Sequence, residues 1–134
     1  MEPQIEEIYL GRVNFRGRDP RYARILQSIV RVSGRYKISL RQDALYFLAN
    51  NIADMVVGPM LGATERGIRL ESGRIVSEEE LFSYIEGDLP LIIESALSAA
   101  NERERQQISA TSVIIGLGRV IDRLQINNTK LWGP

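Results

Sequence analysis

The stretch SEEELFSYIEGDLPLIIESALSAA, residues 77–100, decides the fold because it carries two helix-start signals and long apolar faces. Ser77 followed by Glu80 matches a capping box, in which both side chains satisfy backbone N–H groups of the first turn. Residues 87–90, Gly-Asp-Leu-Pro, predict a second start, so we expect a short helix and then a new one. Small side chains in residues 95–100 would let a neighbouring helix approach closely.

The segment that follows supplies that neighbour. Ser109 predicts the start of a last helix, and residues 113–124 place apolar side chains at regular helical spacing. Gly116 and Gly118 within it permit close packing. Residues 127–134 are predicted to form a C-terminal tail.

The sequence near the N-terminus predicts an arm and then a helix. Residues 5–16 alternate apolar and largely basic side chains, so residues 1–18 are expected to form an arm or short strand. Asp19 is a preferred N-cap, and Pro20 fits the first turn because its missing N–H costs nothing there. Gly34 is a natural C-terminal stop for this helix.

Another helix is expected between these two regions. Ser39 and Gln42 match a capping box, and apolar residues recur after them at helical spacing. Residues 58–59, Gly-Pro, break or kink this helix, and a further helical segment is expected to about residue 70. The sequence thus predicts an all-α fold: one compact multi-helix domain over residues 19–126, with six helical segments.

Three short segments share one pattern, a β-branched residue directly before a serine that opens a helix. Each is either a brief extended segment that pairs with another or a hydrophobic staple in front of an N-cap. The three segments are Lys37-Ile38-Ser39, Ile75-Val76-Ser77 and Gln107-Ile108-Ser109.

The lengths and loop chemistry of residues 22–86 resemble the histone fold. That family has a short helix, a loop, a long central helix, a second loop and a short helix. Here the loop ending Tyr36-Lys37-Ile38-Ser39 is similar to the basic, β-branched, serine loop ending of archaeal histones, and the central helix would span residues 40–70. A weaker echo covers residues 77–124. Another compact helical bundle is the open alternative.

The resemblance implies two sets of contacts. In histone-fold proteins an arginine of the second loop often pairs with an acid of the following helix, here Arg74 with Glu79 or Glu80. The first helix and the loop before the central helix face the DNA backbone in that family. The basic residues at those positions are Arg21, Arg24, Arg35, Lys37 and Arg41.

The basic residues are also unevenly distributed along the chain. The chain has 17 basic and 17 acidic residues, yet residues 12–41 contain nine basic residues and one acidic residue. Such a segment usually meets an acidic partner, so we predict a non-catalytic protein that contacts the phosphates of DNA or RNA with little sequence specificity. The predicted nucleic-acid-binding residues are Arg12, Arg16, Arg18, Arg21, Arg24, Arg35, Lys37 and Arg41.

Two alternatives stay open for these arginines. They can pair with the acidic remainder of the same chain. They can also join complementary basic and acidic faces of a homo-oligomer, most simply a homodimer, in which case the protein is a helical interaction or assembly subunit that binds no nucleic acid.

Composition argues against catalysis. The chain has no cysteine and no histidine, which removes disulfides, thiolate chemistry, the commonest general base and the commonest metal ligand. We therefore expect no enzyme activity, catalytic residue, metal, cofactor or small-molecule substrate. Neither a signal peptide nor a membrane-spanning stretch is expected, so a cytoplasmic or otherwise intracellular location is predicted.

Overall fold

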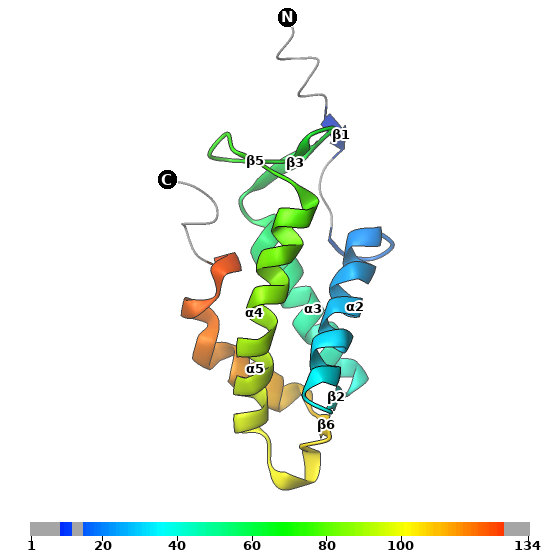
Figure 1. Cartoon of the computed structure of the whole chain (residues 1–134), viewed down its shortest axis with the longest axis vertical. Coiled ribbons are helices and arrows are strands. Elements are labelled where there is room, and N and C mark those ends of the chain that lie inside the picture. The colour runs from blue at the N-terminus through cyan, green and yellow to red at the C-terminus, as the bar shows by residue number, and fades with distance from the viewer. Residues whose placement is uncertain (1–8, 12–14, 128–134) are drawn as a thin grey trace, which may run out of the picture.

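A computed structural model describes residues 9–11 and 15–127 of the chain (Figure 1). Helices make up most of this part: α2 (Pro20–Arg35), α3 (Gln42–Val57), α4 (Glu78–Ala99) and α5 (Ala110–Val120). α2, α3 and α4 run side by side along the long axis, and α5 packs against α4. No helix in the described ranges combines the length and apolar character needed to cross a membrane.

Short strands lie at both ends of the helical body, so the all-α prediction is right about the dominant element and wrong as a fold class, because strands outside the N-terminal arm are also present. At one end β1 (Tyr9–Gly11), β3 (Met60–Thr64), β4 (Gly67–Leu70) and β5 (Ile75–Val76) form an antiparallel sheet in the order β1-β3-β4-β5. β1 confirms the strand expected in the N-terminal arm. At the other end β2 (Ser39–Leu40) pairs in parallel with β6 (Gln107–Ile108).

The prediction of a further helical segment to about residue 70 is wrong, because residues 60–70 form the β3–β4 hairpin. α3 ends at Val57 with Gly58 as its C-cap, as the Gly-Pro pair predicts. In the hairpin Gly67 has φ +139°, and a Cβ there would lie 2.5 Å from the carbonyl oxygen of Val76 on β5. The turn and the close β4–β5 pairing therefore require glycine at position 67, whereas a helix over these residues would not require it. The histone-fold resemblance itself stays a prediction.

α4 is one helix of 22 residues, so the restart expected at residues 87–90 is also wrong. Ser77 caps the helix as predicted, since its hydroxyl accepts the N–H of Glu80 at 3.0 Å. Asp88 has a different use. Its buried carboxylate accepts the backbone N–H groups of Gln125 and Ile126, both at 2.9 Å, and so caps the short 3₁₀ helix Gln125–Asn127. Asp88, which was expected at the start of a new helix, instead caps a segment far along the chain.

The three β-branched–serine segments all contribute to short strands, which confirms the pairing interpretation. Ser77 and Ser109 cap helices as well, because their hydroxyls accept N–H groups of the first turn. Ser39 does not: it lies in β2, and Arg41 is the N-cap of α3 without a side-chain hydrogen bond. The capping box predicted at Ser39 is therefore wrong.

The α4–α5 contact confirms the close packing expected for one glycine of the last helix. A Cβ on Gly116 would lie 2.5 Å from the backbone nitrogen of Ala96, and the Ser95 hydroxyl donates to the Gly116 carbonyl at 2.8 Å. Gly118 has nothing within 4 Å of its hypothetical Cβ, so it plays no part in this contact. The small residues of α4 thus allow the backbone of α5 to pack closely against it at Gly116.

Candidate nucleic-acid interface

The arginines at the start of α2 stabilise the fold of their own chain. Asp19 caps α2 by accepting the N–H of Arg21 at 2.8 Å, and the Arg21 guanidinium pairs with the same carboxylate at 2.5 Å. The side-chain hydrogen bond from Arg21 is the main cause that lowers the pKa of Asp19. The Arg21 guanidinium also lies over the ring of the buried Phe15, 5.1 Å from its centroid.

Ion pairs join α2 to α4. The guanidinium of Arg24 donates to both carboxylate oxygens of Glu79, at 2.9 and 3.0 Å, and lies 4.1 Å from the ring centroid of Phe82. The hydrogen bond to Glu79 is the main cause that raises the pKa of Arg24. Two turns further along both helices, Arg31 pairs with Glu86. The two pairs repeat at the same spacing on both helices.

The remaining arginines near the N-terminal end of α2 differ in their contacts. Arg16 pairs with Asp54 of α3 at 2.6 Å, and both side chains stay substantially exposed. Arg18 is exposed and has no ion pair with any residue the structure describes, and Arg12 lies outside the described residues. Pairing with the acidic remainder of the chain, one of the two alternatives, is thus confirmed for Arg16 and Arg24, whereas Arg21 pairs with Asp19 inside the basic segment.

The other predicted residues lie at the opposite end of α2. Arg35, Lys37 and Arg41 are exposed and form no ion pair within the part of the chain that the structure covers. The β2–β6 pairing brings a second basic segment beside them, through hydrogen bonds of 2.9 Å from Ser39 N–H to the Gln106 carbonyl and from Arg41 N–H to the Ile108 carbonyl. We call the resulting surface the basic end. It consists of Arg35, Lys37, Arg41, Arg103 and Arg105.

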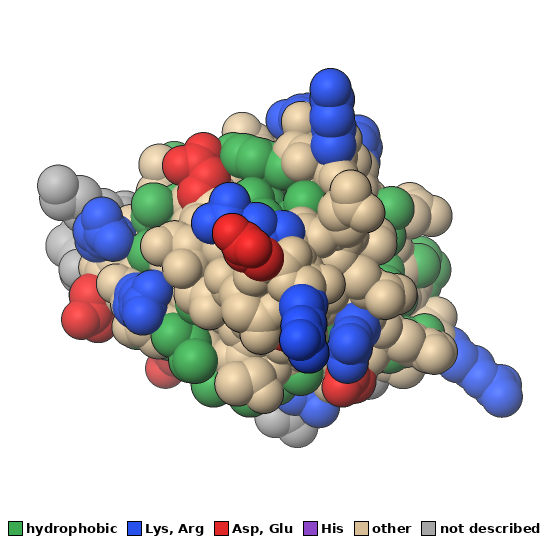
Figure 2. Space-filling view, turned by 90° about the horizontal axis from the view of Figure 1, so that it is seen from below, with side chains coloured by type: hydrophobic (Ala, Val, Ile, Leu, Met, Phe, Trp, Pro, Cys, Tyr) green, Lys and Arg blue, Asp and Glu red, His purple; other side chains and the backbone are tan. Residues whose placement is uncertain are grey.

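Figure 2 views the molecule from this end, and Lys and Arg side chains are spread across it. Residues 35–43 and 102–105 hold five basic and three acidic residues, a net charge of +2. Two of the acids already bind their own chain. Asp43 accepts the N–H of Ala44 at 2.8 Å, and Glu104 accepts the hydroxyl of Ser112. That hydroxyl is the main cause that lowers the pKa of Glu104, and the charge of Arg41 contributes less.

The backbone at Lys37 is the unusual feature of the basic end. α2 ends at Arg35, one residue after the predicted stop at Gly34, and Lys37 has φ +59°. Lys37 N–H donates to the Gly34 carbonyl and Ile38 N–H to the Ser33 carbonyl, the hydrogen-bond pattern of a Schellman motif. In this motif the left-handed position is usually glycine. Lys37 is the only non-glycine residue with positive φ in the described ranges.

Arg103 and Arg105 were not predicted from the sequence. A signal for Arg105 was nevertheless present, because Lys37-Ile38-Ser39 and Gln107-Ile108-Ser109 share the pairing pattern. The register joins Ser39 to Gln107, and Lys37 and Arg105 each lie two residues earlier. Aligning the two segments as a parallel strand pair would have predicted that Lys37 and Arg105 lie close together.

Comparison with known proteins adds no assignment: no protein-family model, no curated protein and no solved structure matches this chain.

Proposed function

We propose that this protein binds the phosphates of nucleic acid through the basic end, without catalysis. The observation that carries the proposal is the presence at one end of the molecule of five exposed basic side chains, from two segments joined by the β2–β6 pairing, none with an ion pair among the described residues. The three acids of the same segments offset part of this charge, and the remaining excess of two positive charges is available to an anionic partner. Arginine suits this role because its guanidinium binds phosphate oxygens in pairs.

The conformation of Lys37 supports the same assignment. A residue with a Cβ in the left-handed region costs roughly 1 kcal/mol more than glycine at the same position. Lys37 at φ +59° therefore stabilises the helix end less than glycine would. Strained residues of this kind cluster at functional sites, where the side chain has a use that offsets its cost. For Lys37, binding of its ammonium group to a phosphate would be such a use.

The start of α3 adds a further electropositive group. Arg41, its N-cap residue, makes no side-chain capping hydrogen bond. The N-terminus of a helix carries a partial positive charge and favours a nearby anion. The carboxylate of Asp43 in the first turn already offsets part of this charge, so the Arg41 guanidinium is the main group that a phosphate here would meet.

Salt dependence of binding tests the proposal. If all five basic residues contact phosphates of a duplex, affinity should fall about 500-fold between about 50 and 200 mM monovalent salt, a log–log slope of roughly −4.5. Fluorescence anisotropy with labelled duplex DNA and single-stranded RNA measures this slope. Absence of binding at about 50 mM salt contradicts the proposal.

A matched pair of double variants locates the site. Lys37→Gln with Arg105→Gln removes two charges from the basic end, and Arg119→Gln with Arg123→Gln removes two exposed charges from α5 and the turn after it. The first variant should reduce the magnitude of the salt slope by about 2, since each lost phosphate contact removes about 1. The second should bind as the unaltered protein does. Equal losses in both would indicate attraction by overall charge and would refute the assignment to the basic end.

A further inference from the structure

One face of α2 is uncharged although the helix is rich in arginine. Its exposed positions at helical spacing are Ala23, Gln27, Val30 and Gly34. Val30 is 58% exposed, more than any other large hydrophobic side chain in the described ranges. The arginines beside this face, Arg24 and Arg31, are already paired with acids of α4. The face is therefore both neutral and partly apolar.

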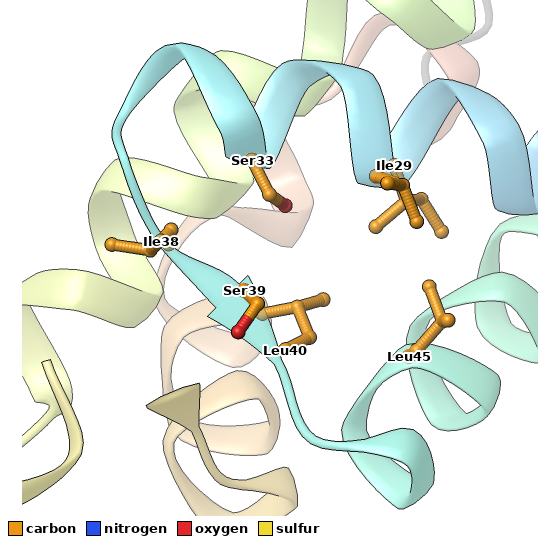
Figure 3. Close-up of a pocket in the computed structure, with 7 residues that line it drawn as sticks. Ile29, Ser33, Ile38, Ser39, Leu40 and Leu45 are labelled. Carbon is orange, nitrogen blue, oxygen red and sulfur yellow. The ribbon is translucent and has the colours of Figure 1, made fainter. Parts of the chain in front are cut away.

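A pocket opens beside Val30, between α2, β2 and the start of α3 (Figure 3). Its volume is about 80 Å³, and its walls are mostly the apolar side chains of Ile29, Ile38, Leu40 and Leu45. A cavity of about 150 Å³ holds a benzene molecule, so this pocket accommodates an aliphatic side chain of a few carbons.

The pocket contains one unsatisfied polar group. Ser33 is 2% exposed, and its hydroxyl has no hydrogen-bond partner among the residues that the structure describes. In Figure 3 this hydroxyl points from α2 into the space that β2 and α3 enclose. A buried hydroxyl without a partner is unfavourable, and an occupant that brings a donor or acceptor removes the penalty.

We propose that this surface is the contact face of a homodimer, in which Val30 of each copy enters the pocket of the other. A two-fold dimer requires one surface that carries both a projecting group and the cavity that receives it. Val30 is one of the residues that line the pocket and is 58% exposed, so the projecting group and the cavity lie on one surface, and a valine side chain fits a cavity of this volume.

Charge sets the salt dependence of this dimer. Two identical surfaces repel each other where they carry unpaired like charges. The face formed by Ala23, Gln27, Val30 and Gly34 is uncharged, and Arg24 and Arg31 beside it are paired with acids of α4. Arg35, Lys37 and Arg41 of the basic end border the pocket, so dimerisation should strengthen as the salt concentration rises. Gly34 has open space around its hypothetical Cβ, which leaves room for the close approach of a neighbouring helix.

Sedimentation equilibrium across about 1–200 µM protein tests the proposal with matched variants. The unaltered chain should reach twice the monomer mass, and Val30→Arg should weaken dimerisation about 30-fold or more, as for the loss of an interface hot spot. Ile114→Arg is the control, because Ile114 is 50% exposed on α5 and lies outside this face. Circular dichroism and thermal melts establish that both variants are folded.

Crosslinking gives an independent result because the chain has no cysteine. Val30→Cys should form covalent dimers with a short bismaleimide, and Ile114→Cys should not. A chain that stays monomeric at about 200 µM overturns the proposal and leaves the pocket to another partner. A dimer that tolerates Val30→Arg but dissociates in Ile114→Arg also overturns it, in favour of an interface on α5. Neither Val30 nor Ile114 belongs to the basic end, so these outcomes do not depend on nucleic-acid binding.

Discussion

Replacing Gly116 with alanine tests the closest helix–helix contact of the fold. The added Cβ would lie 2.5 Å from the nitrogen and 2.6 Å from the Cα of Ala96, and 2.8 Å from the carbonyl carbon of Ser95. All three are backbone atoms of α4, which cannot rotate away as a flexible side chain can. The two helices must therefore separate, and the 2.8 Å hydrogen bond from Ser95 to the Gly116 carbonyl lengthens.

The expected destabilisation follows from these distances. Overpacking a well-packed core costs typically 1–3 kcal/mol, and a clash against backbone lies at the upper end of that range. The weakened hydrogen bond adds about 1 kcal/mol, and the better helix propensity of alanine offsets up to about 1 kcal/mol. We expect Gly116→Ala to lower the free energy of unfolding by about 3 kcal/mol, a decrease in Tm of roughly 10 °C for a chain of this length.

Gly118→Ala is the matched control on the same helix. Nothing lies within 4 Å of its hypothetical Cβ, so only helix propensity changes, and the free energy of unfolding should rise by up to about 1 kcal/mol. Urea titration followed by circular dichroism measures both variants, with equal m-values as the sign of an unchanged unfolding transition. Equal stabilisation by the two substitutions would refute the close α4–α5 contact.

Two further substitutions probe the caps of the fold. Asp88→Asn should cost about 1–3 kcal/mol, because an amide oxygen cannot replace both carboxylate oxygens that accept the N–H groups of Gln125 and Ile126. Burial raises the pKa of Asp88, so its contribution to stability is fully present below the unfolded-state pKa of about 3.9 and is lost as the pH rises through the folded-state pKa. The stability difference between the two proteins in urea should therefore be larger at acidic than at neutral pH, and a constant difference would contradict the buried position. Ser77→Ala should lower the free energy of unfolding by about 1 kcal/mol through loss of the N-cap bond to Glu80, whereas no change in thermal melts would contradict a structural role for that bond.

Local chemistry made several features predictable from the sequence. Asp19 and Ser77 cap α2 and α4 because short polar side chains satisfy N–H groups wherever they precede a helix. The ion pair of Arg74 with Glu80, implied by the histone resemblance, is present. The Gly-Pro pair at residues 58–59 ended α3 as expected. Each of these depends on residues close together in the sequence.

The features that were missed depend on residues far apart. Residues 60–70 form a hairpin because β1 and β5 pair with its two strands, and single-segment periodicity does not reveal such neighbours. α4 continues through Pro90 because its two halves bury apolar side chains in the same core. Arg103 and Arg105 join the basic end only through the β2–β6 pairing. Periodicity within one segment carries no information on any of these contacts.

The most direct test of the proposed function is Lys37→Gly, measured for both stability and nucleic-acid affinity. Glycine removes the strain at φ +59° and also removes one charge from the basic end. The proposal predicts opposite effects: a free energy of unfolding higher by roughly 1 kcal/mol, and weaker binding to duplex DNA or RNA with a salt slope reduced in magnitude by about 1. A variant that is more stable and binds with unchanged affinity and salt slope would contradict a role for Lys37 in phosphate binding.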